Sequence, residues 1–160
     1  MSLDALSAEI GRRLKSASAT LVTAESCTGG WVAEVVTATA GSSAWFDRGF
    51  ITYSNEAKQE VLGVSAGTLA RHGAVSEETA REMALGALAR CRGALALSVT
   101  GIAGPGGGSK EKPVGTVCFA WAKTGSARTE TRRFAGDRES VRKQSVIRAL
   151  EGLLEFLDAA

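Results

Sequence analysis

The sequence predicts one α/β domain over residues 1–160, a three-layer α/β/α fold with a mixed, mostly parallel sheet of about five strands. Three observations support this prediction. A chain of 160 residues suits one domain with a sizeable core. Short apolar runs of strand length alternate with segments of helical periodicity. Neither an internal repeat nor a Pro/Ser-rich linker divides the chain.

Four elements are expected in the first third of the chain. Leu3, Leu6, Ile10 and Leu14 recur at helical spacing, and β-branched residues then mark a short strand. A second helix follows, and its inward face is expected to carry Trp31, Val35 and Val36. The four predicted elements are helix 3–17, strand 20–25, helix 28–39 and strand 45–53.

The middle of the chain predicts two short helical segments, a longer helix and a buried strand. Ser54 or Asn55 offers an N-cap to the first, Gly63 ends it, and Ser76 caps the longer helix. The run ALALSVT lacks alternation, which is typical of a central strand buried on both faces. The predicted elements are helix 55–62, helical turn 65–71, helix 77–91 and strand 94–100.

The last third begins with a glycine-rich loop over residues 101–113. Strands are predicted at 114–122 and 127–134, and the short gap between them indicates a hairpin. Asp137 is positioned to cap a final helix with an apolar stripe. The exposed edge of this hairpin offers a surface for a second subunit, and a homodimer is the default expectation.

Composition excludes several classes of function. A formal net charge of +2 and the lack of a basic-aromatic stripe argue against nucleic-acid binding. Three cysteines without a CxxC motif, and a single histidine, predict no disulfide framework, no metal centre and no cofactor. No apolar run approaches the length of a membrane span and the N-terminus does not resemble a signal peptide, so a cytoplasmic protein is expected.

The segment ESCTGG over residues 25–30 has three possible interpretations. It follows a strand and precedes a helix, so Ser26 or Thr28 is a candidate helix cap. The backbone N–H groups of Cys27, Thr28, Gly29 and Gly30 are equally suited to hold an oxyanion or a phosphate. Ser26 is also a candidate nucleophile, which requires a base.

The base is the missing element of that hypothesis. His72, the only histidine, stands at an apparent helix end, where a C-cap role is favoured. Lys58 is an alternative, provided that burial lowers its pKa, and Tyr53 is a candidate to orient it or relay a proton. Alternatively, Tyr53 belongs to a strand-to-helix cap and Lys58 to a solvated helix face.

Two further features leave alternatives open. Cys27 is either a rival nucleophile with a depressed pKa or a small buried apolar residue. The glycine-rich loop is either a flexible connector or a set of N–H donors for an anion such as phosphate. The P-loop and dinucleotide fingerprints are both absent from it. Its candidate binding residues are Thr100, Gly101, Ala103, Gly104, Gly106 and Gly107.

Six ordered blocks of the sequence together resemble the CinA C-terminal domain family: ESCTGG, TYSNEAK, GAVSEETAREMA, SVTGIAGPGGG, KPVGTV and FAGDRESVR. The resemblance covers about residues 5–155. It implies hydrolysis of the carboxamide of nicotinamide mononucleotide to nicotinate mononucleotide and ammonia, in the recycling of NAD. It also places the family's serine on Ser26, its tyrosine and lysine on Tyr53 and Lys58, and its glycine loop on residues 100–107.

The residues and the resemblance suggest one mechanism. Ser26, deprotonated by Lys58 with help from Tyr53, attacks the carboxamide, and N–H groups of residues 27–29 hold the oxyanion. The glycine loop, with Arg142 or another basic residue, receives the 5′-phosphate. Two alternatives stay open: a non-catalytic nucleotide-binding or competence/damage-response module, and an amidase acting on another small amide.

Overall fold

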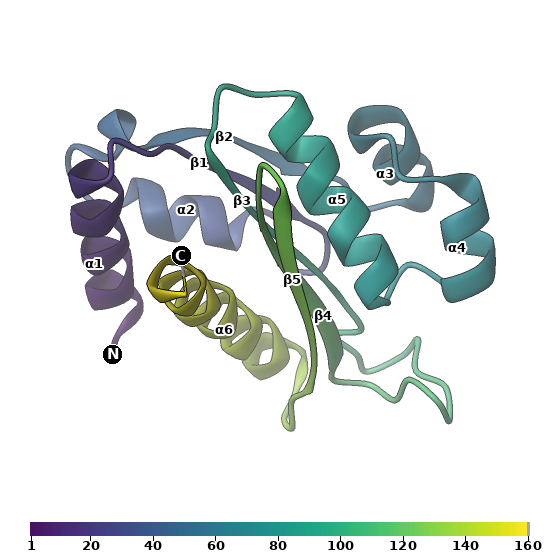
Figure 1. Ribbon diagram of the computed structural model, residues 1–160. Coiled ribbons are helices and arrows are strands. Elements are labelled where there is room, and N and C mark those ends of the chain that lie inside the picture. The colour runs from purple at the N-terminus through teal and green to yellow at the C-terminus, as the bar shows by residue number, and fades with distance from the viewer. Residues whose placement is uncertain (160) are drawn as a thin grey trace.

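The computed structural model describes residues 1–159 and arranges them as a five-stranded sheet between two layers of helices, as the sequence predicts (Figure 1). A short 3₁₀ turn at Ser42–Ala44 precedes the second strand. In chain order the elements are α1 (Leu3–Ser16), β1 (Leu21–Glu25), α2 (Trp31–Thr37), β2 (Phe46–Ile51), α3 (Asn55–Leu62), α4 (Ala66–His72), α5 (Glu77–Ala89), β3 (Leu95–Gly101), β4 (Thr116–Lys123), β5 (Ser126–Arg133) and α6 (Arg138–Asp158).

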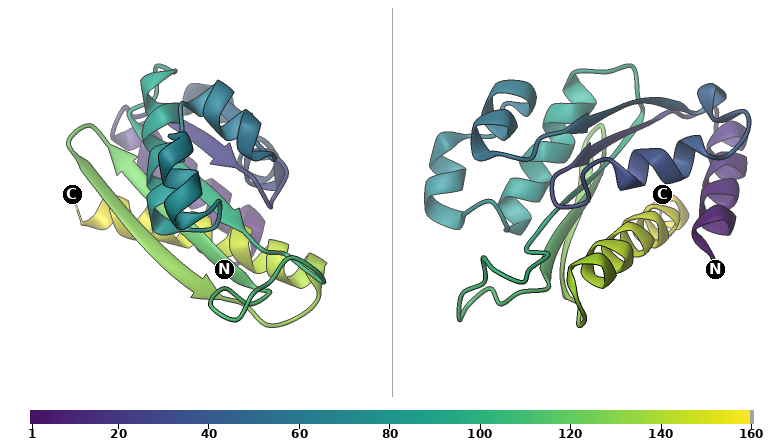
Figure 2. Two further views of the ribbon diagram at one scale, coloured as in Figure 1. Left: turned by 90° about the vertical axis from the view of Figure 1, so that its right-hand side faces the viewer. Right: turned by 180° about the vertical axis from the view of Figure 1, so that it is seen from behind.

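The strand order β2-β1-β3-β4-β5 places the ends of three parallel strands side by side. β1 runs parallel to both β2 and β3, while β4 is antiparallel to β3 and β5, so β4 alone runs against the rest. The views of Figure 2 show the loop between β3 and β4 projecting from one end of the sheet. Binding sites of such sheets form at the carboxyl ends of parallel strands.

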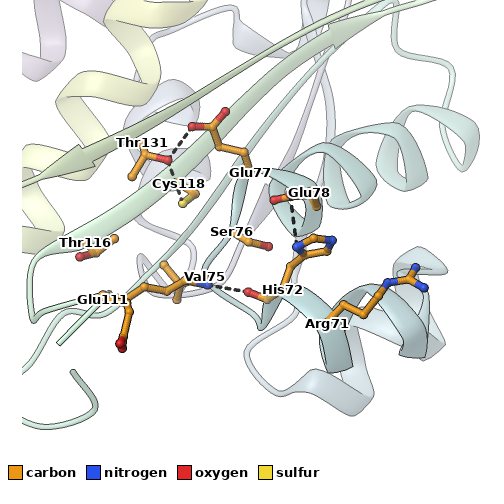
Figure 3. A pocket seen from close by; sticks show the side chains of 11 residues that line it. Arg71, His72, Val75, Ser76, Glu77, Glu78, Glu111, Thr116, Cys118 and Thr131 are labelled. Carbon is orange, nitrogen blue, oxygen red and sulfur yellow. Dashed lines mark hydrogen bonds and ion pairs between the residues drawn. The ribbon is translucent and has the colours of Figure 1, made fainter. Parts of the chain in front are cut away.

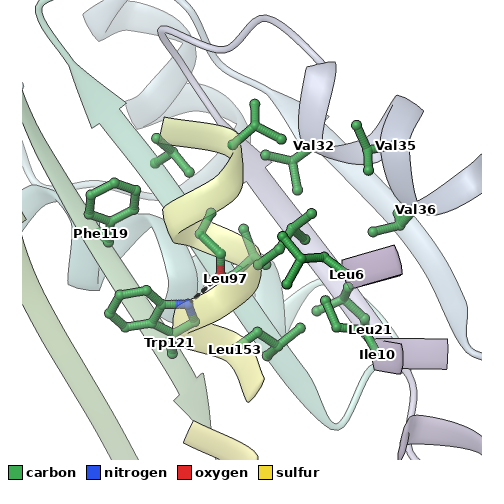
Figure 4. Close-up of a cluster of buried hydrophobic side chains, with 14 of the residues drawn as sticks. Leu6, Ile10, Leu21, Val32, Val35, Val36, Leu97, Phe119, Trp121 and Leu153 are labelled. Atoms are coloured by element: carbon green, nitrogen blue, oxygen red, sulfur yellow. Dashed lines mark hydrogen bonds between the residues drawn. The ribbon is translucent and has the colours of Figure 1, made fainter. Parts of the chain in front are cut away.

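The two sheet faces carry side chains of different size because successive residues of a strand point to opposite faces. One face presents bulky residues such as Leu97, Phe119 and Trp121 to α1, α2 and α6 (Figure 4). The opposite face presents small residues such as Ala96 and Ala120 to α5. Small side chains let α5 lie close to the sheet.

α5 in turn holds α3 through a glycine. A Cβ added at Gly86 would lie 1.9 Å from the carbonyl oxygen of Leu62, the last residue of α3. Only glycine allows this approach, which fixes the height of α3 above the sheet and therefore the position of Lys58 on it.

The second helix differs from the prediction. It begins at Trp31 rather than at residue 28, because Gly29 and Gly30 adopt left-handed φ values of +60° and +105° and keep residues 27–30 in a turn. The inward-facing residues are Val32, Val35 and Val36, whereas Trp31 is only half-buried. None of the helices within residues 1–159 is long and apolar enough to cross a membrane.

Candidate active site

The predicted catalytic segments meet at the carboxyl ends of β2, β1 and β3. Glu25, the last residue of β1, pairs with Ile51 of β2 and Val99 of β3. The residues that follow each strand therefore converge at one edge of the sheet, around a cavity of about 270 Å³. Its lining residues are Ser26, Cys27, Tyr53, Asn55, Lys58, Ala74, Val75, Thr100, Gly101, Ile102, Ala103, Gly104, Gly106, Gly107 and Arg138.

Ser26 and Lys58 form a hydrogen-bonded pair in this cavity. The Lys58 Nζ donates to the Ser26 Oγ over 3.1 Å, although the two residues are 32 positions apart. The Ser26 hydroxyl has a longer contact of 3.4 Å to the Tyr53 carbonyl. A serine hydroxyl beside an amine is the arrangement that a nucleophile and its general base require.

The Lys58 side chain is buried, with 1% of the residue exposed, so the solvated-face interpretation is wrong. Its Nζ also donates to the carbonyl oxygens of Thr52 and Tyr53 at 3.1 and 3.2 Å. Within residues 1–159, no carboxylate pairs with it. Burial lowers the pKa of Lys58 below its usual value, which favours the neutral amine that a base needs.

Tyr53 contributes to this pair through its backbone. Its carbonyl accepts a hydrogen bond from Lys58, while the residue is 62% exposed and its hydroxyl accepts a hydrogen bond from the Arg138 Nη2 at 3.1 Å. Within residues 1–159, no hydrogen bond joins the phenol to Ser26 or Lys58. The group of Tyr53 that contacts Lys58 is therefore its carbonyl rather than its phenol.

Glu25 caps the turn that carries Ser26. Its carboxylate accepts from the Thr28 hydroxyl and from the N–H groups of Gly30, Val32 and Ala33. The expectation that Ser26 or Thr28 caps α2 directly is wrong, because Gly30 occupies the N-cap position and makes no side-chain bond. The cap comes from the preceding strand.

This cap decides which N–H groups of the turn stay available. Gly30 is bound to Glu25, and the Gly29 N–H donates to the Ser26 carbonyl at 3.0 Å. The N–H groups of Cys27 and Thr28 have no acceptor within residues 1–159. Two of the four predicted donors therefore remain for a ligand.

Arg142 secures the opposite side of the same turn. Its guanidinium donates to the carbonyl oxygens of Cys27 and Thr28 at 3.0 and 3.2 Å and lies 5.4 Å from the centre of the Trp31 ring. It does not line the cavity. Arg138, one helical turn earlier on α6, does.

The Cys27 side chain belongs to the apolar core cluster and is 6% exposed. Burial raises the pKa of its thiol to about 12. The thiolate that cysteine chemistry needs is therefore disfavoured, and the small buried apolar interpretation holds.

The glycine-rich loop forms the opposite wall of the cavity. The Thr100 hydroxyl is bound to the Ala74 carbonyl at 2.8 Å, which ties β3 to the segment before α5. Arg138 donates to the Gly104 carbonyl at 2.8 Å. The N–H groups of Ala103, Gly104, Gly106 and Gly107, which line the cavity, have no acceptor within residues 1–159.

A larger cavity of about 610 Å³ adjoins this one at Val75 (Figure 3). It contains none of the predicted site residues. Two of its acids have partners, since Glu77 accepts from Thr131 and Glu78 lies 3.3 Å from the His72 ring. His72 is thus not a partner of Ser26. Within residues 1–159, no three His, Cys, Asp or Glu side chains are grouped to hold a metal ion.

Sequence reasoning missed two residues of the site. The sequence predicts no role for Glu25, although an acid before a turn and a helix is a capping signal, as its bonds to α2 show. Arg138 is not among the residues predicted for the site. Its signal is its position in the first turn of α6, and its place beside Tyr53 becomes visible only in three dimensions.

Comparison with known proteins shows the family of this chain. The family model described as "CinA C-terminal domain" matches residues 3–157. The nicotinamide-nucleotide amidohydrolase PncC of Escherichia coli K12 is 58% identical over 92% of this chain and 90% of that protein. The PncC of Pseudomonas putida is 48% identical over 94% of both.

Solved structures show the same fold. The competence damage-inducible protein A (ComA) of Klebsiella pneumoniae superposes with a TM-score of 0.96 at 45% identity, covering 99% of this chain and 98% of that one. The competence/damage inducible protein CihA of Agrobacterium tumefaciens gives 0.94 at 45% identity, with 99% of both chains covered. The chain belongs to the CinA C-terminal domain family.

Proposed function

We propose that this protein is an amidohydrolase that converts nicotinamide mononucleotide to nicotinate mononucleotide and ammonia. The observation that carries the proposal is the Ser26–Lys58 pair, buried in a cavity at the strand ends. Relatives that are 48–58% identical are named nicotinamide-nucleotide amidohydrolases, which supports this substrate.

In the first half-reaction Ser26 attacks the carboxamide carbon. The neutral amine of Lys58, 3.1 Å from the Ser26 Oγ, takes the hydroxyl proton as the C–O bond forms. The negative charge on the carboxamide oxygen is held by the N–H groups of Cys27 and Thr28. One such donor is typically worth about 3 kcal/mol of transition-state stabilisation.

The lysine then returns its proton to the leaving nitrogen, and ammonia departs from the tetrahedral intermediate. In the second half-reaction Lys58 deprotonates a water molecule, which attacks the acyl-serine ester. The intermediate collapses to nicotinate mononucleotide as its C–O bond to Ser26 breaks and Lys58 returns the proton to the Ser26 Oγ. Neither step requires a metal ion or an organic cofactor.

The charge of the cavity suits a nucleotide phosphate. Within residues 1–159, no carboxylate lines it, and Arg138 is the lining residue that stays cationic when the Lys58 amine is neutral. Arg138 lies beside the free N–H groups of the glycine loop, and such groups together with a guanidinium bind phosphate well. The phosphate is therefore assigned to Arg138 and residues 103–107, rather than to Arg142.

A comparison of three substrates tests the proposal. Ammonia release is measured with nicotinamide, nicotinamide riboside and nicotinamide mononucleotide, for the wild type and for Ser26→Ala. We expect turnover of the mononucleotide, a strong preference for it over the riboside, and no turnover by the variant. Equal rates with all three amides would instead indicate a general small-amide amidase.

The same experiment addresses the non-catalytic alternative, which the names of the solved relatives raise. A folded wild type that binds the mononucleotide without releasing ammonia would point to a regulatory module. If turnover is found, a role in returning nicotinamide mononucleotide to NAD synthesis follows from the product. The cytoplasmic location and homodimeric state also remain proposals, which fractionation and ultracentrifugation would test.

A further inference from the structure

Glu25 is a buried acid that the proposed chemistry does not use. It is 1% exposed at the end of β1, directly before the candidate nucleophile. Its Oε1 accepts from the Thr28 hydroxyl and from the N–H groups of Gly30 and Val32 at 3.2 and 2.9 Å, and its Oε2 accepts from the Ala33 N–H at 3.1 Å. Four donors on one carboxylate fix the turn relative to the strand.

The carboxylate has a second effect besides fixing the turn. It takes up the three N–H groups at the start of α2, where the helix would otherwise attract an anion. A negative charge of the substrate is therefore not drawn to the helix end. The unoccupied donors are those of the turn itself, at Cys27 and Thr28.

The bonds of the turn also set the direction of these two donors. In a planar trans peptide the C=O and N–H groups point in opposite directions. The Cys27 carbonyl is bound to Arg142, so the Thr28 N–H points away from that guanidinium. The Ser26 carbonyl accepts from Gly29, so the Cys27 N–H points away from Gly29.

We propose that Glu25 is a positioning residue that holds the Cys27–Thr28 turn in the geometry of an oxyanion hole. This inference rests on the proposed function. Glu25 does not line the cavity and is not a hydrogen-bond partner of Lys58; it acts through the Thr28 hydroxyl and the first turn of α2. Its loss should weaken binding of the transition state while leaving binding of the substrate in its ground state unchanged.

The test uses Glu25→Gln. The amide group keeps the shape of the side chain but presents N–H where Oε2 accepts from Ala33, so the turn has to rearrange. Glu34→Gln is the matched control, because Glu34 is an exposed acid on α2, the helix that Glu25 caps. Thr28→Val is a second variant, which retains the carboxylate and the Thr28 N–H but removes one bond to Glu25.

Three quantities are measured for each variant: kcat, KM for nicotinamide mononucleotide, and affinity for the corresponding pyridine-3-carboxaldehyde mononucleotide. The aldehyde adds the Ser26 Oγ to its carbon, the serine proton passes to Lys58, and the resulting oxyanion needs the same donors as the transition state. For Glu25→Gln we expect kcat and aldehyde affinity to fall in parallel, by about 100-fold, with KM within about twofold of wild type. For Thr28→Val we expect kcat and aldehyde affinity to fall about 3- to 10-fold, and for Glu34→Gln we expect both to stay unchanged.

Each other outcome has a defined meaning. A folded Glu25→Gln with wild-type kcat and aldehyde affinity would show that Glu25 only caps the helix. A raised KM with unchanged kcat would assign it to substrate binding, which also overturns the proposal. If Glu25→Gln does not fold, an unchanged kcat in Thr28→Val overturns it. A wild type that releases no ammonia defeats the proposed function itself, whereas an active wild type with an equally active Glu25→Gln defeats only the positioning role.

Discussion

The Nζ of Lys58 lies 3.1 Å from the Oγ of Ser26, with 1% of the lysine exposed and no carboxylate beside it within residues 1–159. The lysine comes from α3 and the serine from the turn after β1. Two carbonyl oxygens hold the amine in place. Lys58 is a candidate base in this position, because burial disfavours the charged form of its amine.

Replacement of the amine should abolish turnover. Lys58→Met removes the base and retains much of the buried volume, so we expect a loss of ammonia release of at least about 10²–10⁴-fold. Lys58→Arg should be as inactive, because a guanidinium stays protonated at any working pH. Turnover at the wild-type rate by either variant at neutral pH would remove Lys58 from the mechanism.

The lowered pKa of Lys58 predicts how stability depends on pH. Because the unfolded lysine titrates near its usual value and the folded one below it, the unfolded state binds more protons between the two values. The free energy of unfolding of the wild type, relative to that of Lys58→Met, should therefore rise with pH in that window. It should be lowest at pH values below the window. Urea unfolding of both proteins at pH 7 and 9.5 measures the difference, and a decrease with pH would contradict this sign.

The buried thiol of Cys27 should resist alkylation. With a pKa of about 12, only about one molecule in 10⁵ carries the thiolate at pH 7. Iodoacetamide is therefore expected to label the half-exposed Cys91 in the native protein and to leave both Cys27 and the activity intact. Peptide mass spectrometry identifies the labelled site. Inactivation that follows modification of Cys27 would instead support the rival nucleophile.

Replacement of Arg138 should raise KM for nicotinamide mononucleotide and leave KM for nicotinamide riboside unchanged. Loss of a charged hydrogen bond to the phosphate costs about 1.5–3 kcal/mol, so Arg138→Gln is expected to raise KM for the mononucleotide about 10- to 100-fold. Lys143→Gln, an exposed change of the same charge on α6, is the control. A similar rise of KM for nicotinamide riboside would show that Arg138 acts by holding Tyr53 and Gly104 instead.

Gly86 should link the packing of α5 to the position of Lys58. An added methyl group would lie 1.9 Å from the Leu62 carbonyl, so Gly86→Ala must push α3 from its place, at a cost of about 1–3 kcal/mol in stability. We expect kcat to fall as well, because α3 carries Lys58. Gly67→Ala in α4 is the control, since its methyl group meets nothing closer than 3.4 Å. Equal stability and kcat of the two variants would contradict this link.

Much of the fold is predictable from local patterns. The buried run at Leu95–Gly101, the hairpin of β4 and β5, and the caps Ser54, Ser76 and Asp137 all lie where the sequence predicts them. Each follows from residues within one element, since periodicity and capping act over a few positions. The predicted start of α2 was wrong because the residue that caps this helix belongs to a strand and is not a neighbouring serine or threonine.

The sequence by itself determined the elements, the family blocks and the chemical types of the candidate residues Ser26, Lys58 and Tyr53. Only the tertiary structure decided what each of them does. Parallel pairing of β1 with β2 brings Ser26 to the segment before α3, and burial there changes the charge preference of Lys58. Solvation and distance depend on residues far apart in the chain, and so no local pattern contains them.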